Sequence, residues 1–337
     1  MSQKTIEGRI GRYVNNTIHG WCAIQGESDS IRIECLVDGI SLGELVADNP
    51  RKNLIKKNRS SINHGFAVKI KSEDKIRKIE IFESLTNRQI PGSPTIFDGT
   101  SGQPLVFFMH IPKTAGTSLR HMFDLCFMDE QVFPNITDIK NNDGLYPDIN
   151  SIYSLNKDRL SGLKLVNGHY PLSLADRWLS DMKIVTCFRR PKDRVISHLR
   201  HLKKNDKTCK SLSFDEIYDK HKQTLINLQL RILRNKEYPN AHLIDFNAKK
   251  FNEEKLIATL DRFAAFGIVE DFEQTSIWIS RSLGLTFEKQ VFTNRSSHDL
   301  SLSDQLLEQI EKHTELEDAA YNVIKSEFYR RSVTPNN

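Results

Sequence analysis

The hydrophobic pattern over residues 1–97 is one of short alternating segments. Residues 30–37 place Ile31, Ile33 and Cys35 on one face of a strand, and the tight-turn pair Asp38-Gly39 follows them. Further short strands are expected at residues 8–14, 20–24, 65–70 and 78–82. Several short strands punctuated by turn residues predict a small, all-β, sandwich-like accessory domain over residues 1–97.

After residue 104 the pattern changes to strands that alternate with helices. Residues 105–110 form a continuous apolar run, typical of a strand buried on both faces. Leu119, Met122, Phe123 and Cys126 then fall on one helical face. Further strands are expected at 164–166, 183–188 and 266–269. Strands that alternate with helices predict an α/β domain with a parallel sheet over residues 105–332.

Helix boundaries in this second domain follow from end signals. Pro191 suits a first helical position, and Ser213 to Glu216 form a capping box that opens a long helix to about Arg234. Another helix is expected to end near Gly284, and two C-terminal helices to close the chain. Residues 98–104 are rich in turn formers and predict a linker between the domains.

Composition adds that the protein is globular. Of 337 residues, 38% are hydrophobic and 27% are charged. The apolar run 105–109 is far shorter than the roughly 20 residues of a membrane span, and the N-terminus carries charges where a signal peptide is apolar. We therefore expect a cytoplasmic protein without stable membrane insertion. The five cysteines show no CxxC spacing, which predicts buried reduced thiols and neither a disulfide framework nor a cysteine-based zinc site.

A loop of small and hydroxyl-bearing residues separates the buried strand from the next helix. It reads His110-Ile111-Pro112-Lys113-Thr114-Ala115-Gly116-Thr117-Ser118. Small residues let the backbone approach a ligand, and the N–H groups at a helix start attract anions. This predicts a phosphate site to which Lys113 adds a charge. The loop is not a Walker A sequence, because Lys113 precedes Gly116 by three positions. The alternative is a structural turn with a capping Thr or Ser.

Two further motifs lie at expected strand ends. Arg189 ends one strand and Ser197 follows two turns into the next helix, so that a guanidinium and a hydroxyl can clamp a phosphate together. Nine basic residues against two acidic ones in 189–210 also favour an anionic ligand. His169 follows a short strand and Gly168, where a histidine can act as a general base. The alternatives are a surface ion pair, a solvated helix face and a structural histidine.

In this order and spacing, the three motifs resemble the carbohydrate sulfotransferases that use 3′-phosphoadenosine-5′-phosphosulfate (PAPS), nearest to the bacterial type of the heparan sulfate/uronosyl 2-O-sulfotransferase branch. The resemblance covers roughly residues 104–330. It implies a P-loop-like, three-layer sulfotransferase fold, a 5′-phosphosulfate loop at 113–118 with Lys113 catalytic, a 3′-phosphate held by Arg189 and Ser197, and His169 as catalytic base. Residues 227–231 and 266–272 also look similar to the family, whereas Arg190 stands where relatives often carry an acidic residue.

The resemblance implies metal-independent sulfuryl transfer from PAPS to a hydroxyl of a carbohydrate or glycoconjugate, with no nucleic-acid partner. Two other classes stay open. A P-loop small-molecule kinase needs a Walker-type Lys-Ser/Thr and a carboxylate for Mg²⁺. A non-catalytic carbohydrate-binding protein on a degenerate transferase fold predicts loss of Lys113 or His169, and both are present. The sequence indicates neither the acceptor nor an oligomeric state.

The N-terminal segment carries a second resemblance. Gly20-Trp21, Ala47-Asp48, Arg51, Leu54 and His64-Gly65-Phe66 are similar to a small β domain attached to some bacterial polysaccharide-modifying enzymes. This implies a bacterial protein. Trp21 and His64 are themselves expected to be core residues.

Overall fold

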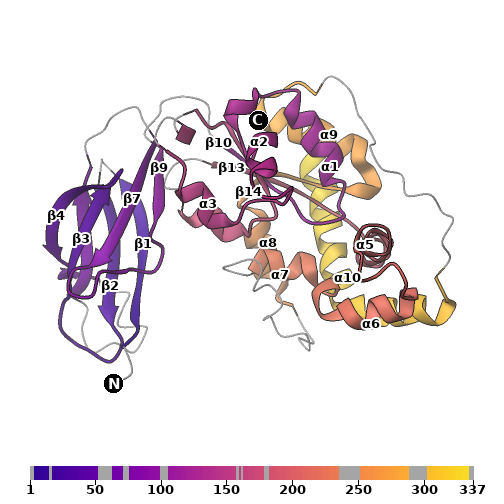
Figure 1. The fold of residues 1–337 in the computed structure, drawn as a ribbon, viewed down its shortest axis with the longest axis horizontal. Helices are drawn as coiled ribbons and strands as arrows, with labels where there is room; N and C mark the ends of the chain where they lie inside the picture. Colours follow the sequence, from indigo (N-terminus) through magenta and orange to yellow (C-terminus); the bar gives the residue numbers. More distant parts are fainter. Residues whose placement is uncertain are drawn as a thin grey trace. The chain divides into compact units, whose positions relative to one another are not determined.

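The computed structural model divides the chain into two compact units (Figure 1). The first unit comprises residues 1–104, 147–163 and 174–182, and the second comprises 105–146, 164–173 and 183–337. The structure describes residues 4–14, 17–51, 63–70, 76–98, 105–156, 159–160, 162–177, 182–234, 251–287 and 302–333. The linker expected at 98–104 lies outside the described residues, apart from Asp98.

Two antiparallel sheets make up the β part of the first unit. One has the order β1 (Ile6–Val14), β2 (Thr17–Ile24), β6 (Asn63–Lys69), β5 (Asn49–Pro50). The other has the order β4 (Ile40–Val46), β3 (Arg32–Val37), β7 (Ile76–Glu83), β8 (Arg88–Gln89), with β9 (Thr95–Asp98) also paired to β7. The expected N-terminal β domain is therefore present.

One hydrophobic core joins these two sheets. Ile18 and Phe66 enter it from the first sheet, and Ile33 and Ile81 from the second. The alternation of residues 30–37 predicts this, because a strand with one apolar face must cover that face with another layer. Trp21 and His64 are buried as expected, but Trp21 lies in a separate small cluster with Ala23 and not in this core.

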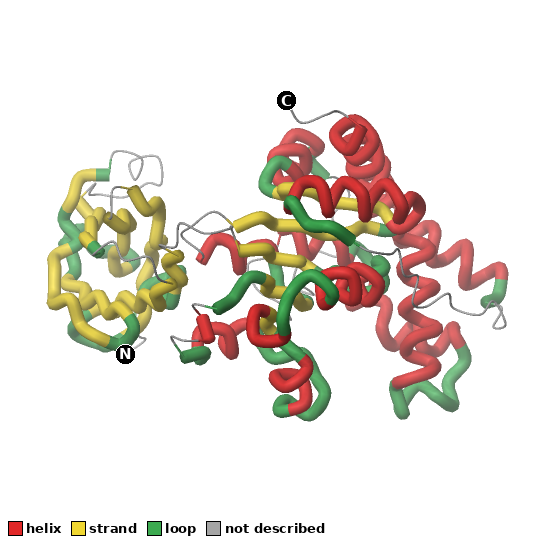
Figure 2. The backbone as a smooth tube through the Cα atoms, turned by 90° about the horizontal axis from the view of Figure 1, so that it is seen from above, coloured by secondary structure: helices red, strands yellow, loops and turns green. Residues whose placement is uncertain are grey.

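The second unit is built around a sheet of the order β11 (Val132–Phe133), β12 (Leu165–Gly168), β10 (Leu105–Met109), β13 (Met182–Phe188), β14 (Phe263–Ile268). β12 pairs in parallel with β10 and with β11, and β13 pairs in parallel with β14. All five residues of β10 are buried, as its continuous apolar run predicts. This unit is a mixed α/β structure in which helices flank a parallel sheet (Figure 2).

The helices are α1 (Gly116–Asp124), α2 (Ile136–Lys140), α3 (Ile149–Tyr153), α5 (Pro191–Asn205), α6 (Phe214–Leu225), α7 (Leu228–Arg234), α8 (Glu253–Leu260), α9 (Phe272–Leu283) and α10 (Asp304–Val333). Three short 3₁₀ segments, η2 (Asp129–Gln131), η3 (Leu172–Arg177) and η5 (Val269–Asp271), complete the list of described helices. α8, α9 and α10 contact β14, while α5 packs on α6 and α10. None of the helices in these described ranges has both the length and the hydrophobicity to cross a membrane.

One helix expectation is corrected, and another falls partly outside the described residues. The helix opened by the Ser213 capping box ends at Leu225 and does not reach Arg234. Ile226 is extended and Asn227 takes a left-handed conformation with φ of 54°, so a second helix, α7, starts in a new direction. At the C-terminus the described residues contain one helix after Gly284, the 30-residue α10, and residues 288–301 lie outside them.

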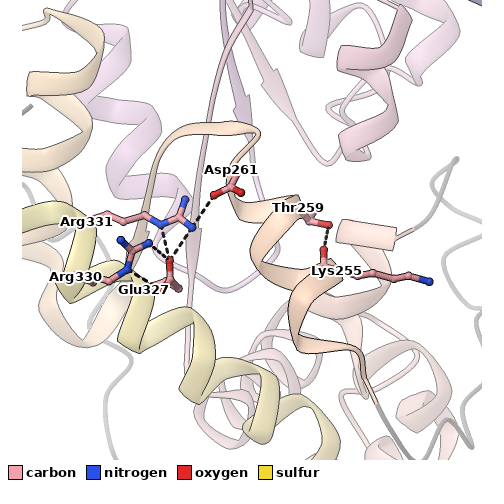
Figure 3. Close-up of polar contacts among 6 residues, drawn as sticks. All are labelled: Lys255, Thr259, Asp261, Glu327, Arg330 and Arg331. Atoms are coloured by element: carbon pink, nitrogen blue, oxygen red, sulfur yellow. Dashed lines mark hydrogen bonds and ion pairs between the residues drawn. The ribbon is translucent and has the colours of Figure 1, made fainter.

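An ion-pair cluster fastens the end of α10 to the turn after α8 (Figure 3). The Arg331 guanidinium pairs with Asp261 at 2.8 Å and with Glu327 at 2.7 Å, and Arg330 shares the Glu327 carboxylate. The same guanidinium lies 5.7 Å from the ring centre of Phe266 on β14. The Arg331 guanidinium therefore joins the last turn of α10 to the turn after α8 and to β14 at the edge of the sheet.

Candidate functional site

The three motifs come together at the ends of neighbouring strands. β10 lies between β12 and β13, so the residues that follow these strands, His110, His169 and Arg189, meet at one edge of the sheet. Two contacts join them: His169 Nδ1 lies 2.8 Å from the His110 carbonyl oxygen, and Arg189 Nη1 donates to the Lys113 carbonyl at 3.3 Å. All the residues predicted for the site lie in the second unit.

The loop after β10 has a strained backbone and an uncapped helix start. Lys113 and Ala115 have φ of 69° and 58°, in the left-handed region that side chains disfavour. The Thr114 hydroxyl is buried and donates to the Ile111 carbonyl at 2.9 Å, so it braces the loop. Ala115 is the N-cap of α1 and no side chain caps the helix. The alternative of a capping Thr or Ser is thus not what the structure contains, and the helix start is available to an anion.

Gly116 is required by the close approach of His110. A Cβ atom at position 116 would lie 1.8 Å from His110 Nε2, so any other residue would displace the imidazole. The His110 ring also stacks on Phe108 at 5.5 Å and lies 4.5 Å from the His169 ring. The small residue at position 116 therefore lets the His110 imidazole lie against the helix start, with the His169 ring beside it.

His169 is held in a defined tautomer. A carbonyl oxygen only accepts hydrogen bonds, so Nδ1, which faces the His110 carbonyl, carries the proton, and Nε2 of the neutral ring keeps its lone pair. Burial lowers the pKa of His169, the carbonyl bond raises it in part, and the Lys113 ammonium lowers it again, with a net pKa below the usual value of 6.5. Such a ring is neutral at pH 7 and can accept a proton.

Lys113 and Arg189 form a pair of neighbouring cations. Burial lowers the pKa of Lys113, and the Arg189 guanidinium lowers it further. Two like charges held together in this way favour an anion between or beside them, because it offsets their repulsion.

Arg189 is fixed through its own backbone. Gln229 accepts from the Arg189 N–H and donates to the Arg189 carbonyl, both at 2.9 Å. The Gln229 N–H donates in turn to the buried carboxylate of Glu317 on α10 at 2.8 Å. The next N–H, of Arg190, donates to Glu270 at 2.7 Å. Sequence reasoning assigned no role to Gln229 or Glu317; the only signal was that residues 227–231 look similar to the sulfotransferases.

The α5 face near the loop holds Ser197 and two histidines that sequence reasoning missed. Ser197 lies half-buried in the second turn of α5, and no hydrogen bond joins its described side chain to Arg189. Burial, then Arg194 and Lys113, lower the pKa of His198 to about 3. Burial and Lys113 also lower the pKa of His201. The Lys113 ammonium therefore acts on α5 as well as on His169.

Tyr146 and Arg120 border His169 on another side. The Tyr146 ring centre lies 5.3 Å from that of His169, and the Arg120 guanidinium stacks on Tyr146 at 5.3 Å. Arg120 also donates to the Tyr146 hydroxyl and pairs with Asp124 at 3.6 Å. Tyr146 lies in a loop whose sequence carries no periodic signal, so only the structure associates it with the site.

Comparisons with known proteins give a distant structural likeness and no match in sequence. No protein-family profile and no curated protein matches the sequence. Among solved structures, the chain is similar to mouse sulfotransferase SULT7A1 complexed with PAP, with 12% sequence identity and a TM-score of 0.32 over 65% of this chain and 67% of that one. Likeness at this level does not determine a function.

Proposed function

We propose that this protein is a sulfotransferase that moves a sulfuryl group from PAPS to a hydroxyl of a carbohydrate or glycoconjugate. The observation that carries the proposal is the His169 ring, held in its neutral Nε2-acceptor form by the His110 carbonyl beside the Lys113–Arg189 cation pair. A base next to a dianion-binding loop is the arrangement that such a transfer needs. The carbohydrate acceptor, the bacterial origin and the cytoplasmic location rest on sequence and motif resemblance.

The donor would be held by two groups of residues. The loop from Lys113 to Ser118 and the uncapped start of α1 suit the 5′-phosphosulfate. Arg189 suits the 3′-phosphate, because its backbone is fixed by Gln229 and its guanidinium lies beside the loop. Ser197 is the proposed second ligand of that phosphate.

The transfer step follows from these positions. The acceptor oxygen forms a bond to sulfur while its proton passes to His169 Nε2. The bond between sulfur and the bridging oxygen of the 5′-phosphate breaks, and the electron pair stays on that oxygen. The Lys113 ammonium offsets the growing charge, and adenosine 3′,5′-bisphosphate (PAP) leaves. His169 then returns its proton to solvent.

A two-part experiment tests the proposal. First, PAP should raise the melting temperature of the full chain in the presence of EDTA, whereas ATP with Mg²⁺ should have a smaller effect; the reverse ranking would favour a kinase. Second, incubation with ³⁵S-labelled PAPS and glycans from the source cell should give a labelled sulfate ester. PAP binding without transfer to any glycan would point to a degenerate, non-catalytic protein.

A further inference from the structure

A cysteine, a histidine and a carboxylate meet between the end of α5 and α6. One ligand atom from each of Asp206, Cys209 and His221 lies within 4.8 Å of the other two. Asp206 ends α5, Cys209 follows in the connecting turn, and His221 projects from α6. Among the described residues no other group of this kind occurs, and the proposed transfer step uses none of the three.

The cluster is held together by its own turn. The Cys209 N–H donates to the Asp206 carbonyl at 3.0 Å, and Cys209 Sγ lies 3.5 Å from His221 Nε2. The Cys209 side chain is buried in the core between α5 and α6, while Asp206 and His221 are half-buried. The sulfur is thus anchored by packing, and the other two groups leave one side open to solvent.

The Sγ–Nε2 separation of 3.5 Å fits two ligands of one zinc ion. Tetrahedral zinc with a Zn–S bond of about 2.3 Å and a Zn–N bond of about 2.0–2.1 Å puts sulfur and nitrogen about 3.5–3.6 Å apart. The mixed sulfur, nitrogen and oxygen set suits zinc and excludes calcium or magnesium, which take oxygen ligands.

Thr208 supplies the outer support that such a site requires. Its N–H and its hydroxyl both donate to Asp206 Oδ1 at 2.8 Å, which orients the carboxylate. Lys220 in turn donates to the Thr208 hydroxyl at 2.9 Å. The surrounding lysines do not oppose the ion, because Zn²⁺ with one thiolate, one carboxylate and one neutral imidazole carries no net charge.

We propose that Asp206, Cys209 and His221 bind one Zn²⁺, with a fourth position left to water. The ion clips the turn after α5 to α6, and it acts on the stability of this helix pair and takes no part in the sulfuryl transfer. The sequence did not reveal the site because Cys209 and His221 are 12 positions apart and no CxxC motif is present.

Zinc uptake by the full chain tests the proposal. The reduced, tag-free protein is freed of metal with a chelator and dialysed against low-micromolar Zn²⁺, and bound metal is counted by elemental analysis. Wild type should hold one Zn²⁺ per chain. Cys209→Ser and His221→Gln should each lower the affinity for Zn²⁺. The loss should be at least the roughly 10- to 100-fold that changes to outer-shell residues alone cause. Co²⁺ in place of Zn²⁺ should give a thiolate-to-metal charge-transfer band that Cys209→Ser abolishes.

Matched control variants show whether zinc uptake depends on the proposed ligands or on any cysteine or histidine. His121→Gln on α1 and Cys126→Ser just after α1 change the same residue types and should leave uptake at one ion per chain. Melting in EDTA checks that each variant is folded. No uptake by wild type, or equal uptake by wild type and folded Cys209→Ser, overturns the proposal. PAP binding is measured on the same samples, so either proposal can fail without the other.

Discussion

At the scale of single residues, the site depends on which nitrogen of His169 is free. The His110 carbonyl holds the proton on Nδ1 and leaves Nε2 as the acceptor. The same His110 packs on Gly116, so the histidine that orients the base is itself positioned by the loop that faces the proposed donor. Base and anion site are thereby placed relative to each other through one residue.

Replacing His169 and replacing Lys113 should both lower turnover, but only the change at Lys113 should also weaken PAP binding. His169→Ala should lower kcat by roughly 10²–10⁴, the usual worth of general acid–base catalysis, and should leave PAP affinity near wild type. Lys113→Ala should lower kcat and also weaken PAP binding, because its charge lies in the anion loop before any reaction. Calorimetric titration with PAP and a labelled transfer assay measure both. Near-normal turnover of His169→Ala at saturating acceptor would return His169 to a structural role.

The titration of His198 should contribute to the pH dependence of the protein's stability. Burial, Arg194 and Lys113 hold its folded-state pKa at about 3, below the unfolded value of about 6.5. The unfolded chain therefore binds the proton more readily, and stability falls as the pH drops below 6.5. For this group alone the loss at pH 5 is about 2 kcal/mol. Urea unfolding between pH 7 and pH 5 should show a flatter profile for His198→Gln than for wild type, and no flattening for the exposed His121→Gln.

At the scale of elements, the break between α6 and α7 sets the position of Arg189. Asn227 turns the chain, and α7 then presents Gln229 to both main-chain groups of Arg189. A single helix to Arg234, as the capping box and the apolar pattern predict, would carry Gln229 along the α6 axis. The long-range hydrogen bond that the Gln229 N–H donates to the Glu317 carboxylate stabilises the new helix start.

Loss of Gln229 should weaken binding of the 3′-phosphate of PAP. Arg189→Ala should weaken PAP binding by about 1.5–3 kcal/mol, the usual worth of hydrogen bonds to charged groups, with a much smaller effect on AMP, which lacks that phosphate. Gln229→Ala should weaken PAP more than AMP in the same way, because Arg189 then loses both backbone partners. Gln274→Ala is the control, since Gln274 makes a similar bond to the Ser332 carbonyl. Equal losses for PAP and AMP would contradict the positioning role.

The elements that the sequence predicted are those with a one-sided or continuous apolar pattern. β3 and β10 follow from their buried positions, and α9 from its end signal at Gly284. β4 was missed, and the structure shows that nearly all of its seven residues are exposed, so it has no buried apolar face. The loop, His169 and Arg189 were predicted as strand-end residues, whereas Gln229 and Glu317 depend on contacts 40 and 88 residues apart that no local pattern carries.

At the scale of the whole molecule, the two units have separate cores. The core of the β sandwich is drawn entirely from residues 6–90, and the parallel sheet begins at Leu105. Every residue of the proposed transfer site belongs to the second unit. The proposed transfer site therefore contains no residue from the sandwich.

A chain that starts near Gly102 should fold and bind PAP with the affinity of the full chain, because the anion loop, His169, Arg189 and α5 are all retained. Residues 147–163 and 174–182 belong to the first unit together with the sandwich. In the shortened chain these segments lose the sandwich, which should lower the melting temperature without changing PAP affinity. Calorimetric titration with PAP and a thermal melt separate the two effects. A shortened chain that is soluble and binds PAP poorly would show that the sandwich shapes the donor site. An insoluble one beside a well-behaved full chain would show that the sandwich covers a face of the second unit.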